Sequence, residues 1–380
     1  MTLRVLHLSA GNLYGGIERL LTTLALERAC CEQMEPSFGL CFDGKVAAEL
    51  RSEGVPVHLL GDVRFSRPWT MWRARRGLRN LLRRERYDVA ICHACWPHAL
   101  FGSVIRDVGV PLVFWAHDIP RMVHWSERKA AKVHPDLVLA NSKYTAERLP
   151  TLFPAVKTEV CYAPVSLGSA HLSPTIREDV RRELETDSAD VAIVMFARME
   201  EWKGHDLLLA ALRKLNDLPG WTCWIAGGAQ RPSEHQYLDR LRNLASESPV
   251  SGRIRFLGQR SDIPRLLAAA DIHCQPNMGP EPFGLAFIEA LAAGLPLVTT
   301  EIGAAAEIVT PACGRLVPPA DPSALARALR ELVTGVKSDS QLSDACRNRA
   351  AELCAPASQI LQLMRLFRGL AGSRATSGGQ

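Results

Sequence analysis

The sequence alternates short apolar runs with amphipathic stretches of helical period, and this alternation constrains the fold more than any other feature. Strand candidates such as "RVLHLSAG" and "PLVFWAHD" are apolar without strict alternation, whereas "GGIERLLTTLALERA" places apolar residues on one helical face. Strands of this kind, separated by helices, indicate parallel sheets that are covered on both faces. The sequence therefore predicts an α/β protein made of doubly wound units.

The alternation occurs in two series, separated by a segment rich in Pro, Gly and Ser around residues 163–171. At 380 residues the chain is also longer than one hydrophobic core usually serves. We predict two Rossmann-like domains, residues 1–166 and 167–355. A final helix over 356–372 is expected to pack back on the first domain, with a disordered tail over 373–380. The expected ligand site is a cleft between the domains, at the carboxyl ends of the strands.

The composition is that of an ordinary soluble protein, with 47% hydrophobic residues, 22% charged residues and a net charge of +5. This modest charge does not indicate nucleic-acid binding. Eleven cysteines lie mostly in apolar runs, which is typical of buried residues in a reducing compartment. The cluster "CHACWPH" lacks a second ligand pair, so structural cysteines are favoured over a zinc site. We expect a cytoplasmic protein, because no apolar run is long enough to span a membrane.

Candidate site residues follow two strands of the first series. Gly11, Gly15 and Gly16 form a strand-to-helix loop, where backbone N–H groups can approach an anion or a substrate. A tight turn explains the same glycines, and their spacing does not match a dinucleotide fingerprint. His117 and Asp118 end an apolar strand, a position at which a functional and a structural histidine are about equally expected.

Two further sites follow strands of the second series. Arg198 and Lys203 suit a diphosphate, although an exposed turn would carry the same charges. Glu281 precedes a helix predicted over 283–293, and Glu289 lies two turns inside it among apolar residues. Backbone N–H groups at the helix start could bind phosphate, and a ribose diol would satisfy the Glu289 carboxylate.

These motifs together resemble the retaining family 4 glycosyltransferases, which have the GT-B fold of two facing Rossmann-like domains. The resemblance runs from "GGIERLL" through "NSKYTAERL" and "FARMEEWKGHDLLLAAL" to "PEPFGLAFIEALAAGLPLVTT". The last stretch is similar to the family's Glu-x7-Glu signature. The resemblance implies transfer of a hexose-type sugar from a nucleotide donor, with a UDP-sugar favoured, to a hydroxyl acceptor. It also implies retention of anomeric configuration without a metal ion or a cofactor other than the sugar nucleotide.

The resemblance also assigns roles to individual residues. The expected catalytic residues are His117, Glu281, Arg198 and Lys203. The expected donor-binding residues are Gly15, Gly16, Arg198, Lys203, Pro282, Phe283, Gly284, Leu285 and Glu289. The sequence departs from the family pattern with a Gly303-Ala304 pair in place of two glycines and with Cys95 where a second histidine is common.

An arginine-rich segment is the main indication of the acceptor. Nine arginines and a single acid, Glu85, lie between Arg64 and Arg86, in a stretch that also contains Trp69 and Trp72. Outward-facing side chains could bind peripherally to the inner face of an anionic membrane. Such contact would give access to a lipid-linked acceptor of the cell envelope. The arginines proposed for this contact are Arg73, Arg75, Arg76 and Arg79. A solvated helix remains the alternative.

Three other functions remain open from the residues. One is a GDP-sugar-dependent transferase that acts on a small molecule. Another is a non-catalytic sugar-nucleotide-binding protein, which the retained charges of Arg198, Lys203, Glu281 and Glu289 disfavour. The third is a sugar-nucleotide epimerase or a phosphorylase of related architecture, and the helix between the two glutamates favours the transferase over both.

Overall fold

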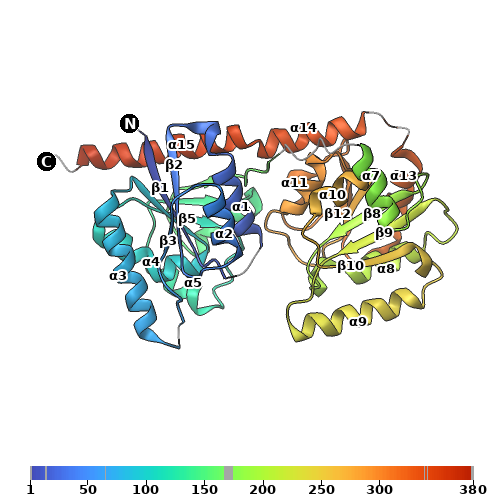
Figure 1. Ribbon diagram of the computed structural model, residues 1–380, viewed down its shortest axis with the longest axis horizontal. Coiled ribbons are helices and arrows are strands. Elements are labelled where there is room, and N and C mark those ends of the chain that lie inside the picture. Colours follow the sequence, from blue (N-terminus) through green and yellow to red (C-terminus); the bar gives the residue numbers. More distant parts are fainter. Residues whose placement is uncertain are drawn as a thin grey trace. The chain divides into compact units, whose positions relative to one another are not determined.

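The computed structural model describes residues 2–12, 15–64, 66–166, 174–337, 339 and 341–377. The chain divides into two compact units, an N-terminal domain of residues 1–166 with 354–380 and a C-terminal domain of residues 167–353. Each domain is a wholly parallel sheet covered by helices (Figure 1). The prediction of doubly wound α/β domains is therefore confirmed.

The N-terminal domain has a seven-stranded sheet of order β3-β2-β1-β4-β5-β6-β7. Its strands are β1 (Leu3–Ser9), β2 (Met34–Leu40), β3 (Val57–Leu59), β4 (Val89–His93), β5 (Leu112–Ala116), β6 (Leu137–Ala140) and β7 (Thr158–Val160). The strand order reverses between β1 and β4, which is where ligands bind in sheets of this type. The sequence did not reveal β7, because this three-residue edge strand is only half-buried and lacks an apolar run.

The helices of the N-terminal domain include one from the far end of the chain. They are α1 (Gly16–Leu26), η1 (Arg28–Cys31), α2 (Lys45–Ser52), α3 (Pro68–Glu85), α4 (Cys95–Val108), α5 (Trp125–Ala130), α6 (Lys143–Ala146), η2 (Leu149–Thr151) and α15 (Pro356–Ser377). Helix α15 buries Leu363 and Phe367 and packs against η1, close to β1 and β4. It extends to Ser377, beyond residue 372 where the sequence predicts its end, since each added residue of a formed helix gains a hydrogen bond.

The C-terminal domain has a six-stranded sheet of order β10-β9-β8-β11-β12-β13. Its strands are β8 (Val191–Phe196), β9 (Trp221–Ala226), β10 (Ile254–Gly258), β11 (Ile272–Gln275), β12 (Leu297–Thr300) and β13 (Gly314–Val317). All six coincide with apolar runs from which strands were predicted. The order again reverses at the middle of the sheet, between β8 and β11, so the loops that follow these two strands lie at the expected ligand position.

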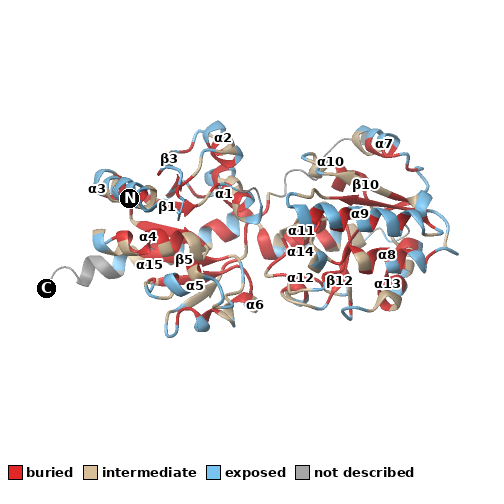
Figure 2. Ribbon diagram, turned by 90° about the horizontal axis from the view of Figure 1, so that it is seen from below, coloured by how far each residue is buried: buried red, intermediate tan, exposed pale blue. Residues whose placement is uncertain are grey.

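Helices cover both faces of the second sheet. They are α7 (Pro174–Glu183), η4 (Glu201–Lys203), α8 (His205–Arg213), α9 (Pro232–Ser246), η5 (Ser251–Arg253), α10 (Ile263–Ala269), α11 (Leu285–Ala292), α12 (Ala305–Ile308), α13 (Pro322–Gly335) and α14 (Leu342–Cys354). Buried residues concentrate on the strands and on the inward faces of the helices (Figure 2). No helix in the described part of the chain is long and apolar enough to cross a membrane.

Candidate functional site

A buried ion pair joins the loops that follow β8 and β11. Nζ of Lys203 lies 2.6 Å from Oε2 of Glu281, and the two side chains are only 14% and 11% exposed. The ammonium group also lies 3.9 Å from the centre of the Trp202 ring. A lysine expected at the diphosphate and a carboxylate expected beside the donor sugar are thus in direct contact in the ligand-free protein. Both charges are partly desolvated, which strengthens their interactions with any ligand group nearby.

Two amides that the sequence did not single out hold the Glu281 carboxylate. Nδ2 of Asn277 donates to Oε2 of Glu281 at 3.2 Å, and Nε2 of Gln275 lies 3.5 Å from the same oxygen. Gln275 also donates to Oδ1 of Asn277, and both residues are almost fully buried. These donors all converge on Oε2 of Glu281, so among the described residues Oε1 is left as the available acceptor. The signal in the sequence was the polar pair in "HCQPN", directly after a buried strand.

A close backbone approach brings the two loops together. The N–H group of Met278 donates to the carbonyl oxygen of Trp202 at 2.7 Å. Gly204, with φ of +81°, lies so close to Pro276 that a Cβ atom on Gly204 would be 1.8 Å from the Pro276 carbonyl oxygen. Only glycine fits this position, both sterically and for its left-handed backbone. Gly204 therefore sets the separation of Lys203 from the β11 loop.

The Gly303-Ala304 departure from the family pattern is compatible with this geometry. Gly303 has φ of +72°, and a Cβ atom there would lie 2.3 Å from the carbonyl oxygen of Glu281. Ala304 instead has an ordinary φ of −80°, and its N–H group donates to that carbonyl oxygen at 2.9 Å. The glycine that the geometry requires is retained, and the methyl group of Ala304 is buried.

Helix α11 begins beside Glu281. The helix was predicted from Phe283, but it starts at Leu285, because Gly284 adopts a left-handed conformation with φ of +96° as the N-cap. Gly284 provides no side-chain cap, and within the described residues the N–H groups of Leu285 and Ala286 have no acceptor. Glu289 lies one turn further along, half-buried. The start of α11 is therefore available to an anionic or hydroxyl oxygen.

Arg198 is more exposed than Lys203. Its Nη2 atom lies 3.1 Å from Oε1 of Glu200, and its side chain is 48% exposed. The other carboxylate oxygen of Glu200 accepts a hydrogen bond from the Trp202 indole at 3.1 Å. Glu200 thus orients both neighbours, and about half of the Arg198 side chain remains accessible to solvent.

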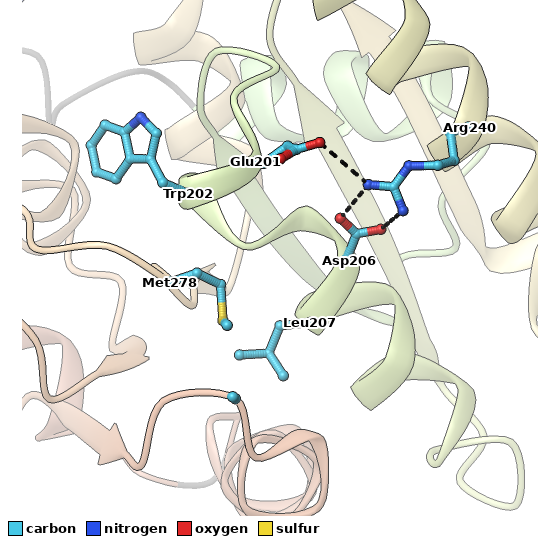
Figure 3. Close-up of a pocket in the computed structure, with 7 residues that line it drawn as sticks. Glu201, Trp202, Asp206, Leu207, Arg240 and Met278 are labelled. Atoms are coloured by element: carbon cyan, nitrogen blue, oxygen red, sulfur yellow. Dashed lines mark hydrogen bonds and ion pairs between the residues drawn. The ribbon is translucent and has the colours of Figure 1, made fainter.

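A cavity of about 560 Å³ adjoins these loops within the C-terminal domain (Figure 3). Its lining residues are Glu201, Trp202, Asp206, Leu207, Arg240, Met278 and Ala320. Arg240 is already neutralised, with both terminal nitrogens 3.0 Å from the carboxylate oxygens of Asp206. The remaining surface is largely apolar, from Leu207 and Met278. Sequence reasoning missed this cavity, because its walls come from four separate segments.

In the N-terminal domain, His117 follows β5 at the carboxyl edge of the sheet, as predicted. Its Nε2 atom lies 2.9 Å from Nδ1 of His93, and Nε2 of His93 lies 3.0 Å from Nδ1 of His7. Desolvation lowers the pKa of His117 and of His7 to about 3, and it lowers that of His93 well below the usual value. The three rings are therefore neutral at physiological pH. The sequence did not reveal the contribution of His7.

The glycine loop before α1 is partly occupied by the protein's own carboxylate. The N–H group of Gly15 donates to Oε2 of Glu18 at 3.0 Å, and burial raises the pKa of this glutamic acid. Gly15 has an extended backbone that any residue could adopt, whereas Gly11 has φ of +80°. Residues 13 and 14 of this loop lie outside the described residues.

The cysteine and histidine cluster at the start of α4 is held by contacts within the domain. Nε2 of His98 donates to the carbonyl oxygen of Val133 at 2.7 Å. Burial raises the pKa of Cys95 to about 12, which disfavours the thiolate that a metal ion would bind. Across the described ranges, no group of three or more potential ligands is close enough to hold a metal ion.

Helix α3 carries the arginine-rich segment. One face of the helix is buried, through Ala74, Leu78, Leu81 and Leu82. Two of the four arginines expected to face outward lean toward α4, where Arg75 donates to Ser103 and Arg79 pairs with Asp107. Arg73 and Arg76 are exposed, beside exposed Trp69 and Trp72. Of the four arginines proposed for membrane contact, only two are therefore exposed on α3.

Comparisons with known proteins agree with this architecture. Residues 14–168 match the family model of Glycosyltransferase Family 4, and residues 176–349 match that of Glycosyl transferases group 1. The two domains thus define a protein of the GT-B class. The chain belongs to the GT-B glycosyltransferases of the family 4 and group 1 type.

Individual relatives are more distant. The lipopolysaccharide core biosynthesis mannosyltransferase LpsB of Rhizobium meliloti is 27% identical over 64% of this chain and 62% of its own length. A GDP-mannose-dependent monoacylated alpha-(1-6)-phosphatidylinositol monomannoside mannosyltransferase of Corynebacterium glutamicum is 27% identical over 67% of this chain and 69% of its own. The aligned part of the chain spans only about half to two thirds of such relatives.

The fold is shared with solved structures over nearly the whole chain. Anabaena HepE, solved in complex with UDP and glucose, superposes with a TM-score of 0.84 and 23% sequence identity. The match covers 97% of this chain and all of HepE. At this identity the similarity establishes the fold alone.

Proposed function

We propose that the protein transfers a hexose-type sugar from a nucleotide donor to a hydroxyl acceptor, with retention of anomeric configuration. The observation that carries this proposal is the buried Lys203–Glu281 pair beside the open start of α11. A cation, a carboxylate with one oxygen that is unpaired among the described residues, and backbone N–H groups that lack an acceptor there match the two parts of a sugar diphosphate. The cation and the N–H groups meet phosphate, and the carboxylate meets sugar hydroxyls.

The charges at the site suit the expected transition state. Cleavage of the bond between the anomeric carbon and the diphosphate places negative charge on the leaving oxygens and positive charge on the sugar. Lys203 and Arg198 stabilise the leaving diphosphate, while the Glu281 carboxylate lies on the sugar side. These groups are held in place before the reaction, so little reorganisation is needed when charge develops. Glu289 would hold the ribose through its carboxylate.

Retention follows from a front-face course. The leaving phosphate accepts the proton of the acceptor hydroxyl as the new bond forms on the same face of the sugar. No side-chain nucleophile is then required, and the reaction as proposed requires no metal ion. His117 would contact the donor sugar from the N-terminal domain, and Gly15 and Gly16 would leave room for the acceptor near the phosphates.

A UDP-sugar is the favoured donor, and a lipid-linked saccharide of the envelope is the favoured acceptor. HepE binds UDP, whereas the Corynebacterium relative is described as GDP-mannose-dependent, so guanosine remains the alternative base. The Rhizobium relative is named for lipopolysaccharide core biosynthesis, and the Corynebacterium relative is named for a phosphatidylinositol monomannoside. The exposed arginines and tryptophans of α3 would bring the protein to an anionic membrane that carries such an acceptor.

Turnover of a panel of UDP- and GDP-sugars tests the proposal, with released nucleoside diphosphate as the readout. We expect release from at least one donor, and Lys203→Ala and Glu289→Ala should reduce it by about 100-fold, as is common for lost transition-state contacts. Lys214→Ala, an exposed lysine just after α8, is the matched control and should retain activity. Binding without turnover would support the non-catalytic alternative, and the absence of both would refute the proposal.

A further inference from the structure

The three histidines of the N-terminal sheet form a diagonal row on one face. His7 on β1 is paired in register with Ile91 on β4, and His93 lies two residues beyond Ile91. His93 is in turn paired with Trp115 on β5, two residues before His117. Each step moves to the neighbouring strand and two residues toward the carboxyl edge. Because side chains alternate along a strand, the three rings lie on the same face.

The rings are joined edge to edge rather than merely packed. The centroids of neighbouring rings are 5.2 Å apart, with interplanar angles of 29° for His7 and His93 and 13° for His93 and His117. Nitrogen–nitrogen distances of 3.0 and 2.9 Å are those of hydrogen bonds. His7 and His93 are almost fully buried, whereas His117 is half-buried at the sheet edge. The row therefore runs from the core to the expected ligand position.

Only two proton arrangements are compatible with three neutral rings. Each neutral ring carries one proton, and each of the two hydrogen bonds uses one, so the third proton lies at one end of the row. It is either on Nε2 of His7 or on Nδ1 of His117. Nε2 of His7 is buried and has no hydrogen-bond partner within the described ranges. Nδ1 of His117 likewise has no partner among the described residues, but it lies at the edge where a ligand can reach it.

The buried end decides between the two arrangements. A buried N–H group without an acceptor is rare in native proteins, because its desolvation is not compensated. The arrangement with the proton on Nε2 of His7 is therefore disfavoured. His7 then donates through Nδ1 to His93, and His93 donates through Nδ1 to Nε2 of His117.

We propose that His7 and His93 are positioning residues that fix His117 as the Nδ1–H tautomer, so that His117 presents a hydrogen-bond donor to an oxygen of the donor sugar. The identity of the ligand in this inference rests on the proposed function. The assignment of the tautomer rests only on the hydrogen bonds and burial of the three histidines. A neutral donor at this point recognises a hydroxyl oxygen without adding a charge near the positively charged sugar of the transition state.

Substitution of His93 provides a matched pair of variants. In His93→Asn the amide nitrogen can take the place of the ring Nδ1 and still donate to His117. His93→Leu has nearly the same shape as the asparagine variant but has no donor. The tautomer is read from long-range ¹H–¹⁵N spectra of protein with ¹⁵N-labelled histidine at neutral pH, and the His117 signals are assigned by their loss in His117→Ala.

We expect the Nδ1–H tautomer in the wild type and in His93→Asn, and its loss in His93→Leu. If wild-type His117 is protonated on Nε2, or if the tautomer is unchanged in His93→Leu, the proposal is overturned. The wild-type spectrum decides the first point even if a variant fails to fold.

Kinetics then test the consequence for the reaction. His93→Leu should lower kcat by about tenfold with a smaller change in KM, which is the effect expected for one lost hydrogen bond. His93→Asn should retain most of the wild-type kcat. Equal kcat values for the two variants would overturn the positioning role. Absence of turnover in every variant including the wild type would refute the proposed function, while the tautomer measurement would stand separately.

Discussion

Gly204 and Pro276 are in contact through their backbones, so closely that a single methyl group on Gly204 would overlap the Pro276 carbonyl oxygen at 1.8 Å. This contact lies one residue from Lys203 and within the loop that leads to Glu281. The short distance between the lysine and the glutamate is thus imposed by the main chain. A side chain cannot be added at Gly204 unless the two loops separate.

Gly204→Ala should therefore destabilise the C-terminal domain more than an alanine at a left-handed position without a steric clash would. Gly220 provides the matched control, because it has a similar φ of +74° but no atom within 4 Å of the position that a methyl group would take. We expect a loss of about 1 to 2 kcal/mol in unfolding free energy for Gly220→Ala and about 3 kcal/mol for Gly204→Ala. Urea unfolding measures both, and equal losses would mean that the loops separate at no cost.

Asn277→Asp should impair turnover although it changes almost no volume. The new carboxylate would lie near Oε2 of Glu281, where Asn277 now donates at 3.2 Å. The two carboxylates would repel each other and compete for the ammonium group of Lys203. We expect kcat/KM to fall by about 10- to 100-fold, which corresponds to about 1.4 to 2.7 kcal/mol. Asn277→Ser, which adds no charge, should have the smaller effect, and the reverse order would contradict this account of the site.

Buried histidines should make the protein sensitive to mild acid. Burial lowers the pKa of His98 to about 4 from its ordinary value of 6.5, so the unfolded chain binds a proton below pH 6.5 that the folded protein does not. Stability is therefore present above pH 6.5 and is lost as the pH falls toward 4. Between about pH 7.5 and about pH 5.5 one such histidine lowers the free energy of unfolding by about 1.4 kcal/mol.

His98→Gln measures this contribution, because its amide can still donate to the Val133 carbonyl oxygen. The difference in unfolding free energy between the two pH values should be smaller in the variant by the same amount. An unchanged difference would show that His98 does not remain neutral in the folded protein. His7, His93, His117, His205 and His273 also have lowered pKa values, so the wild type should lose more than one histidine accounts for.

Membrane contact should depend on two of the four arginines first considered. Arg73 and Arg76 are exposed, while Arg75 and Arg79 are engaged with Ser103 and Asp107 of α4. Arg73→Ser with Arg76→Ser should weaken cosedimentation with vesicles that contain phosphatidylglycerol by about tenfold or more. Arg75→Ser with Arg79→Ser removes the same charge and should have less effect. Equal effects of the two pairs would indicate a nonspecific response to net charge, and no effect of either would exclude this contact.

The fold and the site differ in how much the sequence reveals. Apolar runs predicted the six strands of the second sheet, because a strand buried on both faces must be apolar along its length. The weak edge strand at Thr158–Val160 lacked that signal. Lys203 and Glu281 were singled out from their positions after strands and received roles from a resemblance. The hydrogen bonds and close contacts of Gln275 and Asn277 with Glu281 were not predicted. Polar residues next to a buried strand indicate a site only once the fold shows what they face.

The same limit applies to the histidine row. His117 was placed at a strand end, and His93 was noted only within a cysteine cluster. His7 lies 86 positions before His93, and register between strands is not visible in one sequence. Long-range pairing of this kind depends on strand order, which the apolar pattern does not encode.

Helix α15 also has a consequence for how the protein is made. Its buried Ile360, Leu363 and Phe367 complete the core of a domain whose strands come from the first 166 residues. During synthesis those strands leave the ribosome long before α15 exists, and the whole C-terminal domain is translated in between. The surface that α15 later covers is exposed to water for that interval, when apolar surface is prone to aggregation. Emergence of α15 from the ribosome, rather than completion of the first sheet, therefore sets the time at which the N-terminal domain can reach its native stability.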